Sequence, residues 1–148
     1  MTAIQLQQAT EKTATLALGE HVECVGVDVV DIPQFARVAD LAGRRFTQRL
    51  FTNDELAFCG ESAKRLATTV AGKEATVKVL GSGFRDGTTW LDIEILRKLG
   101  GTPYVCLSGA ARERAHVLGL RRIAISLSHE LTFAVAVAFG IRSGENNV

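Results

Sequence analysis

The sequence lacks the features that mark several large classes of protein. It has no apolar stretch of about 18 residues, so we expect no membrane-spanning helix. Its three cysteines, Cys24, Cys59 and Cys106, are far apart and include no CxxC pair, which argues against a disulfide framework or a zinc site. The first 14 residues show no basic region followed by an apolar core, so we expect no signal peptide and a cytoplasmic protein.

An excess of one charge is also missing. The 17 Lys and Arg residues against 16 Asp and Glu give a formal net charge of +1, which argues against a nucleic acid or a membrane as the main partner. A P-loop, a Rossmann GxGxxG motif after a strand and a GxSxG elbow are absent as well. With 148 residues, 47% of them hydrophobic, the chain can still bury the core of one domain.

The first half of the chain predicts one strand followed by helices. We expect an N-terminal extension over residues 1–19, a folded domain over 20–141 and a C-terminal tail over 142–148. The near-continuous apolar run His21–Ile32 predicts a strand buried on both faces. Helices are then expected after Asp31 and Pro33, within FTNDELAF, where Thr52 and Glu55 fit a capping box, and over Ala63–Leu80, which GSG ends.

The second half predicts two hairpins with a helix between them. Residues 88–108 alternate and contain a Gly-Gly turn signal, and Gly109–Leu118 is amphipathic. The strands RRIAISLS and LTFAVAVAFG are separated only by His129 and Glu130, so they should pair antiparallel. The whole order predicts an α+β fold, a mostly antiparallel sheet packed with helices.

Asp28 is the anomaly of the first strand, because a buried acid must be paired or bound to a cation. Glu74 and Lys78 lie four residues apart on the third predicted helix and so project from one face. If this helix crosses the strand, Asp28 and Glu74 give two carboxylates that suit Mg²⁺, with Lys73 and Lys78 beside them for a phosphate. The alternatives are a structural ion pair between Asp28 and an arginine, and a surface pair of Glu74 with Lys78.

Ser128 and His129 lie in SLSHE at a tight connection between strands. They could donate hydrogen bonds to a phosphate, although a loop histidine is more often plain polar surface. A Ser-His-Asp triad is disfavoured, because Ser128 adjoins His129 in the chain.

Three ordered segments, VGVDVVDI, GKEATVKVLGSG and ISLSHE followed by AVAVAF, resemble the holo-acyl-carrier-protein synthase type of 4′-phosphopantetheinyl transferase. RRFTQRLFTNDEL and WLDIEILRKLGGTPYVCLSG are similar to that family too, and the resemblance covers about residues 23–140. It implies an enzyme that transfers the 4′-phosphopantetheine arm of coenzyme A to a serine of an apo acyl carrier protein and releases adenosine 3′,5′-bisphosphate. It also implies a homotrimer with active sites at the subunit interfaces.

The resemblance assigns roles to individual residues. Asp28 and Glu74 would ligate Mg²⁺, Glu74 or a metal-bound water would take the serine proton, and Lys78 would stabilise the departing phosphate. Coenzyme A would be held by Lys73, Lys78, Gly81, Ser128 and His129. The carrier would meet a basic helix face formed by Arg37, Arg44 and Arg45.

The sequence departs from the family pattern at three positions, one of which is Val70, where an aromatic residue is usual. Thr69 stands where a basic residue is usual, and Gln34 stands where an arginine that contacts the carrier is often found. These departures motivate an alternative, a non-catalytic trimeric module that binds coenzyme A or a carrier. The sequence does not specify the carrier (fatty-acid, polyketide or other), the acyl state of the coenzyme A, or the role of residues 1–19.

Overall fold

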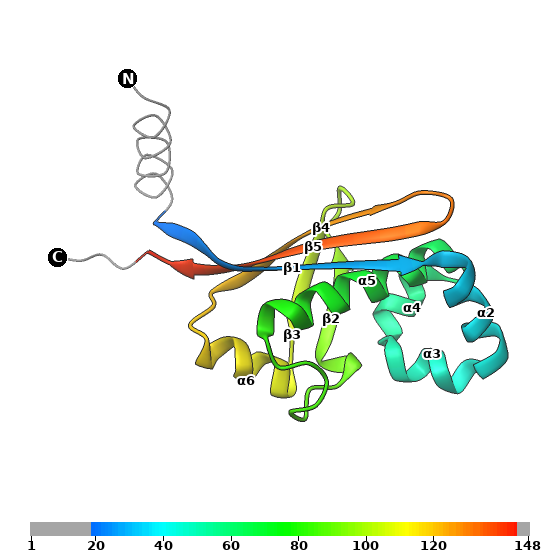
Figure 1. Cartoon of the computed structure of the whole chain (residues 1–148), viewed down its shortest axis with the longest axis horizontal. Helices are drawn as coiled ribbons and strands as arrows, with labels where there is room; N and C mark the ends of the chain where they lie inside the picture. Colours follow the sequence, from blue (N-terminus) through cyan, green and yellow to red (C-terminus); the bar gives the residue numbers. More distant parts are fainter. Residues whose placement is uncertain (1–18, 145–148) are drawn as a thin grey trace, which may run out of the picture.

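A computed structural model describes residues 19–144 of the chain (Figure 1). In chain order the elements are β1 (Glu20–Asp31), α2 (Ile32–Ala42), α3 (Arg44–Leu50), α4 (Asn53–Cys59), α5 (Ala63–Leu80), the 3₁₀ turn η1 (Trp90–Asp92), β2 (Ile93–Arg97), β3 (Pro103–Leu107), α6 (Gly109–Val117), β4 (Arg122–His129) and β5 (Phe133–Ser143). The predicted α+β class is confirmed. The expected N-terminal extension lies, apart from Gly19, outside the described residues.

The strands form two antiparallel sheets. The larger one has the order β1-β5-β4, and β2 and β3 pair as a separate hairpin. Both predicted hairpins are confirmed, but β4 includes His129 and β5 begins only at Phe133, so the connection is Glu130–Thr132. It is one residue longer and lies further along the chain than expected, because His129 still pairs with Ala134 across the hairpin.

Local side-chain chemistry sets the helix starts. The Asp31 carboxylate caps α2 by accepting a hydrogen bond from Gln34 N at 2.8 Å. At α4 the predicted capping box is confirmed: Thr52 N donates to Glu55 Oε2 at 2.9 Å, and Glu55 N donates to Thr52 Oγ1 at 3.3 Å. Helix α5 ends at Gly81, whose φ of 67° is the left-handed conformation that glycine tolerates.

Helix α5 packs against one face of the larger sheet, as Figure 1 shows. The contact is close because small residues line it. A Cβ on Gly26 would stand 2.0 Å from Ala75 O, so only glycine fits where β1 meets the helix. On β5 the residues facing α5 are the fully buried Ala134, Ala136 and Ala138.

The opposite face of the larger sheet is open. Val25, Val27 and Val29 of β1 are 56, 47 and 56% exposed, and Phe133 and Phe139 of β5 are 49 and 36% exposed. The prediction that the first strand is buried on both faces is therefore wrong for this chain alone. Side chains alternate along a strand, so α5 covers the face with Gly26 and Asp28, and in the described part of the chain nothing buries the valine face. No described helix is long and apolar enough to cross a membrane.

Candidate functional site

Asp28 and Lys78 meet where α5 crosses β1. Lys78 Nζ lies 3.0 Å from Asp28 Oδ1 and donates a second hydrogen bond to Val27 O at 2.7 Å. The Lys78 side chain is 52% exposed and the Asp28 side chain 17% exposed. Since an ammonium group carries three hydrogens, Lys78 keeps one donor for a ligand at the surface. The partner of Asp28 is thus a lysine, and the alternative of an arginine partner is wrong.

Glu74 lies one turn before Lys78 on α5 and is half-buried. Burial raises the pKa of its carboxyl, the nearby Asp28 carboxylate raises it further, and Lys78 lowers it. The two acids are therefore close enough to repel each other, as the crossing of strand and helix predicted. Glu74 makes no ion pair within 4.0 Å in the described residues, so the surface pair with Lys78 is not formed.

This donor set fits a magnesium ion. Carboxylate oxygens are the ligands that Mg²⁺ prefers, and it usually keeps several waters or phosphate oxygens as its other ligands. Burial and the repulsion from Asp28 raise the pKa of Glu74, and a divalent cation between the two carboxylates would relieve the repulsion. Residues 19–144 contain no cluster of three or more His, Cys, Asp or Glu side chains that could hold a metal, and Asp28 and Glu74 are the two carboxylates that would ligate the ion.

Lys73 points away from this cluster. Its ammonium group is fully buried, lies 2.7 Å from Glu55 Oε2 and donates to Trp90 O at 2.9 Å. Glu55 Oε1 accepts a hydrogen bond from Ile95 N at 2.8 Å. Burial lowers the pKa of Lys73, and Glu55 opposes that shift. The expectation that Lys73 stands beside the two carboxylates for a phosphate is wrong in this structure, because its ammonium group is buried against Glu55.

Ser128 and His129 end β4, two strands away from Asp28. Both are exposed, and His129 Nδ1 lies 3.3 Å from Thr68 Oγ1 near the start of α5. Asp28 pairs with Ala136 of β5, and Leu127 of β4 pairs with the same alanine. With about 4.8 Å between neighbouring strands, β1 and β4 lie about 10 Å apart. Within one chain the structure therefore does not bring His129 into contact with the Asp28–Lys78 pair.

The other expected coenzyme A residues are placed differently. Gly81 is exposed at the end of α5, one turn after Lys78. Thr69, the departure from the family pattern, is 2% exposed and lies 3.4 Å from Cys59 Sγ, so its hydroxyl faces the core.

Arg37, Arg44 and Arg45 are all exposed on α2 and α3. Leu41, which lies between them in the chain, is 89% exposed. This surface combines positive charge with an apolar contact.

Three residues that support the site were missed from the sequence: Gly26, Glu55 and Thr68. Gly26 had a usable signal, because a glycine inside an apolar strand often marks close approach of another backbone. Glu55 was assigned to the capping box alone, and nothing in the sequence connects it with Lys73. Thr68 carries no local signal, since its partner His129 is 61 residues away.

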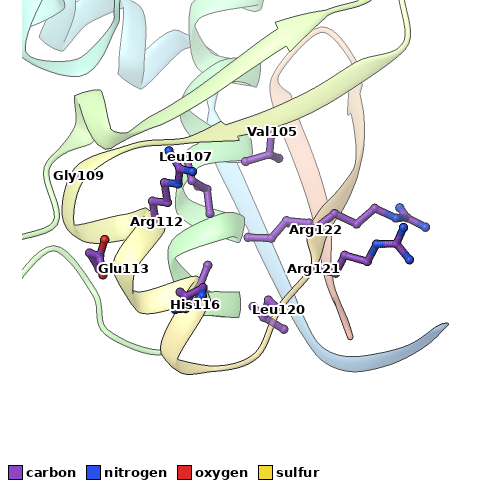
Figure 2. Close-up of a pocket in the computed structure, with 11 residues that line it drawn as sticks. Val105, Leu107, Gly109, Arg112, Glu113, His116, Leu120, Arg121 and Arg122 are labelled. Atoms are coloured by element: carbon purple, nitrogen blue, oxygen red, sulfur yellow. The ribbon is translucent and has the colours of Figure 1, made fainter. Parts of the chain in front are cut away.

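A hollow of about 790 Å³ lies away from these residues, between α6, β3 and β4 (Figure 2). Arg112 and His116 of α6 line one side, and Arg121 and Arg122 line the other. Arg121 and Arg122 both pair with Glu20, at 3.2 and 2.9 Å. Asp28, Glu74 and Lys78 do not line this hollow, so cavity shape in a single chain does not mark the carboxylate cluster.

Known proteins are similar to this chain in sequence and in fold. The model of the 4′-phosphopantetheinyl transferase superfamily matches residues 24–136. Over 114 residues, 75% of this chain and 91% of the relative, the chain is 40% identical to the holo-[acyl-carrier-protein] synthase of Koribacter versatilis (strain Ellin345). It is 41% identical to that of Geotalea daltonii (strain DSM 22248 / JCM 15807 / FRC-32) over 115 residues, 76% of this chain and 92% of the relative.

Solved structures agree. The holo-[acyl-carrier-protein] synthase of Helicobacter pylori in complex with coenzyme A aligns with a TM-score of 0.71 and 27% identity, over 78% of this chain and 97% of that one. The synthase of Mycobacterium tuberculosis aligns with a TM-score of 0.63 and 34% identity, over 83% of this chain and 99% of that one. From motif order, sequence identity and fold together, the chain belongs to the 4′-phosphopantetheinyl transferase superfamily and, within it, to the holo-acyl-carrier-protein synthase type of enzyme.

Proposed function

We propose that the protein transfers 4′-phosphopantetheine from coenzyme A to a serine of an apo acyl carrier protein, with Mg²⁺ bound by Asp28 and Glu74. The observation that carries the proposal is the meeting of Asp28, Glu74 and Lys78 at the crossing of β1 and α5. The names of the relatives and the coenzyme A complex of the Helicobacter pylori enzyme support the choice of substrates.

The reaction is a displacement at phosphorus. The serine oxygen forms a bond to the β-phosphorus of coenzyme A as the bond from that phosphorus to the bridging oxygen breaks, so adenosine 3′,5′-bisphosphate leaves. When bound, the metal ion neutralises charge on the pyrophosphate. Glu74 accepts the serine proton as the general base. Lys78 directs its free hydrogen at the leaving phosphate.

Coenzyme A would also contact Gly81, Ser128 and His129, of which the two last lie two strands from Asp28. Lys73 takes no direct part in this proposal, because its ammonium group is enclosed with Glu55.

The open valine face of the larger sheet supports a homotrimer as the working form. Its exposed valines and phenylalanines form an apolar surface of the kind that a subunit interface buries. In such an assembly His129 of one subunit and Asp28 of another can serve the same coenzyme A, which places the active sites between subunits. We propose a cytoplasmic location for the assembly.

The basic surface of α2 and α3 supports the carrier as partner. Arg37, Arg44 and Arg45 offer positive charge, and Leu41 offers an apolar anchor beside it. This pairing suits an acidic helix with an apolar face, and charge complementarity chiefly raises the association rate.

A panel experiment tests the proposal. The protein is incubated with coenzyme A, Mg²⁺ and several apo carriers of fatty-acid and polyketide type. The intact mass of each carrier is then measured by mass spectrometry. One carrier at least should gain the mass of one phosphopantetheine, and only with Mg²⁺ present. Glu74→Gln should abolish the gain and leave the oligomer unchanged by light scattering. Binding of coenzyme A without any mass gain would favour the non-catalytic module instead.

A further inference from the structure

Thr68 holds His129 through a hydrogen bond whose direction the geometry fixes. Thr68 Oγ1 lies only 2.6 Å from Lys64 O, so the single hydroxyl hydrogen must lie between these two oxygens. The same hydroxyl oxygen lies 3.3 Å from His129 Nδ1. With its hydrogen already used, Thr68 Oγ1 can only accept here, and His129 Nδ1 must be the donor.

We propose that Thr68 is a positioning residue for His129, holding the imidazole with its hydrogen on Nδ1 so that Nε2 is the atom that meets a phosphate of coenzyme A. The proposal rests on the proposed function for the identity of the ligand. Thr68 itself is 3% exposed and His129 is exposed, so the anchor is buried while the imidazole stands at the surface.

The orientation decides what Nε2 can do. In the neutral ring with Nδ1–H, Nε2 has only a lone pair, which repels a phosphate oxygen. Nε2 donates to a phosphate only after the ring has taken a second proton, and that hydrogen bond is then charge-assisted. Glu130 follows His129 in the chain and Lys64 lies one turn before Thr68, but no ion pair to His129 forms in the described residues. The contact with Thr68 therefore leaves Nε2 as the ring nitrogen that faces a ligand.

Nitrogen NMR of histidine-labelled protein tests the orientation directly. Long-range ¹H–¹⁵N spectra distinguish Nδ1–H, Nε2–H and the doubly protonated ring, and His129→Gln identifies the signal. At a pH where His129 is neutral, the wild type should show Nδ1–H alone. Adding coenzyme A should shift the Nε2 signal and leave the hydrogen on Nδ1. A wild-type ring with its hydrogen on Nε2 would overturn the proposal, and so would an Nε2 signal that coenzyme A leaves unchanged.

Matched variants separate positioning from a general structural role. Thr68→Val should give a mixture of tautomers and Thr68→Ser should restore the wild-type spectrum. Thr76 makes the same kind of bond, to Gly72 O at 2.8 Å on the same helix, so Thr76→Val is the control that should leave His129 unchanged. A Thr68→Val spectrum identical to the wild type would refute the idea.

Kinetics give a second readout. Losing one orienting hydrogen bond should raise KM for coenzyme A about threefold to tenfold in Thr68→Val and change kcat less than about twofold. A fall in kcat with constant KM would contradict the role. If no carrier is modified at all, the proposed transferase function fails, while the spectra still decide the role of Thr68.

Discussion

Two lysines on α5, five residues apart, each pair with a carboxylate, and their surroundings differ completely. The side chains of Lys73 and Glu55 are both 0% exposed and lie 2.7 Å apart, and their three other hydrogen bonds all join them to backbone atoms of this chain. Lys78 and Asp28, at 3.0 Å, are 52 and 17% exposed, and Lys78 keeps a free donor. The same chemistry therefore stabilises the fold at one position and remains available to a ligand at the other.

The two lysines differ in exposure because different elements pack around them. Lys73 lies over Phe51, with Nζ 5.7 Å from the ring centroid, where α4 and β2 pack against α5. Lys78 crosses β1 beside Gly26, and β1 is the edge strand of the larger sheet, so the Lys78 side chain stays half-exposed. Of these two lysine-carboxylate pairs, only the exposed one can contact a substrate.

The largest expected effect is on the buried pair. Lys73→Met should lower the free energy of unfolding by about 3–5 kcal/mol, because Glu55 is left charged and unpaired in the core. Urea unfolding measures this, with Lys78→Met as the matched control, expected to change stability by less than about 1 kcal/mol. The double variant Glu55→Gln/Lys73→Met should recover part of the loss. If Lys73→Met and Lys78→Met lowered the free energy of unfolding equally, the proposed difference between the buried and the exposed pair would be wrong.

Loss of the exposed lysine, Lys78, should impair transfer and leave stability almost unchanged. Lys78→Met should slow phosphopantetheine transfer about 10²–10³-fold, because the donor to the developing charge is lost, while the unfolding curve barely moves. Single-turnover assays with coenzyme A, Mg²⁺ and the accepted carrier give the rate. Transfer within threefold of the wild type would show that Lys78 has no part in the chemistry.

Alanine substitutions at Gly26 and Gly72 test how closely α5 must approach the larger sheet. Gly26→Ala places a methyl against a backbone oxygen, so α5 must move away from β1, at a cost of about 2–3 kcal/mol and with slower transfer. Gly72→Ala meets only side-chain carbon atoms, all at 3.2 Å, and should cost about 1 kcal/mol. Thermal unfolding and transfer assays compare them, and a harmless Gly26→Ala would contradict the close contact.

The smallest effect is a gain in stability. Glu74→Gln should raise Tm slightly in a chelating buffer at neutral pH, because burial and Asp28 both disfavour the ionised Glu74. Since the pKa of Glu74 is raised, the destabilising charge is present at neutral pH and disappears as the pH falls through that raised pKa. The two proteins should therefore converge in acid. A variant less stable than the wild type at neutral pH would argue against the repulsion.

Much of this arrangement could be predicted from the sequence, since it depends on local patterns. The capping box at Thr52, the end of α5 at Gly81 and the antiparallel hairpins each follow from neighbouring residues. The convergence of Asp28 with Glu74 needed only the assumption that a helix crosses a strand.

The rest depends on contacts between distant segments. Nothing in the sequence near Lys73 shows that Glu55, 18 residues earlier, will contact it. The local sequence also does not distinguish the buried Lys73 from the exposed Lys78. The apolar composition of β1 predicts burial of its valine face, but composition does not show whether the same chain or another subunit would cover that face.

Glu55 has a consequence for how the protein unfolds. One carboxylate receives hydrogen bonds from the start of α4, the backbone of β2 and the side chain of Lys73 on α5. Opening any one of these elements removes a partner from a charge that the other two still enclose, so partial opening is penalised. We expect the amides of Thr52 and Ile95 to exchange with solvent deuterium at the same slow rate as the centre of α5, so that the small hairpin and the helices form a single cooperative unit.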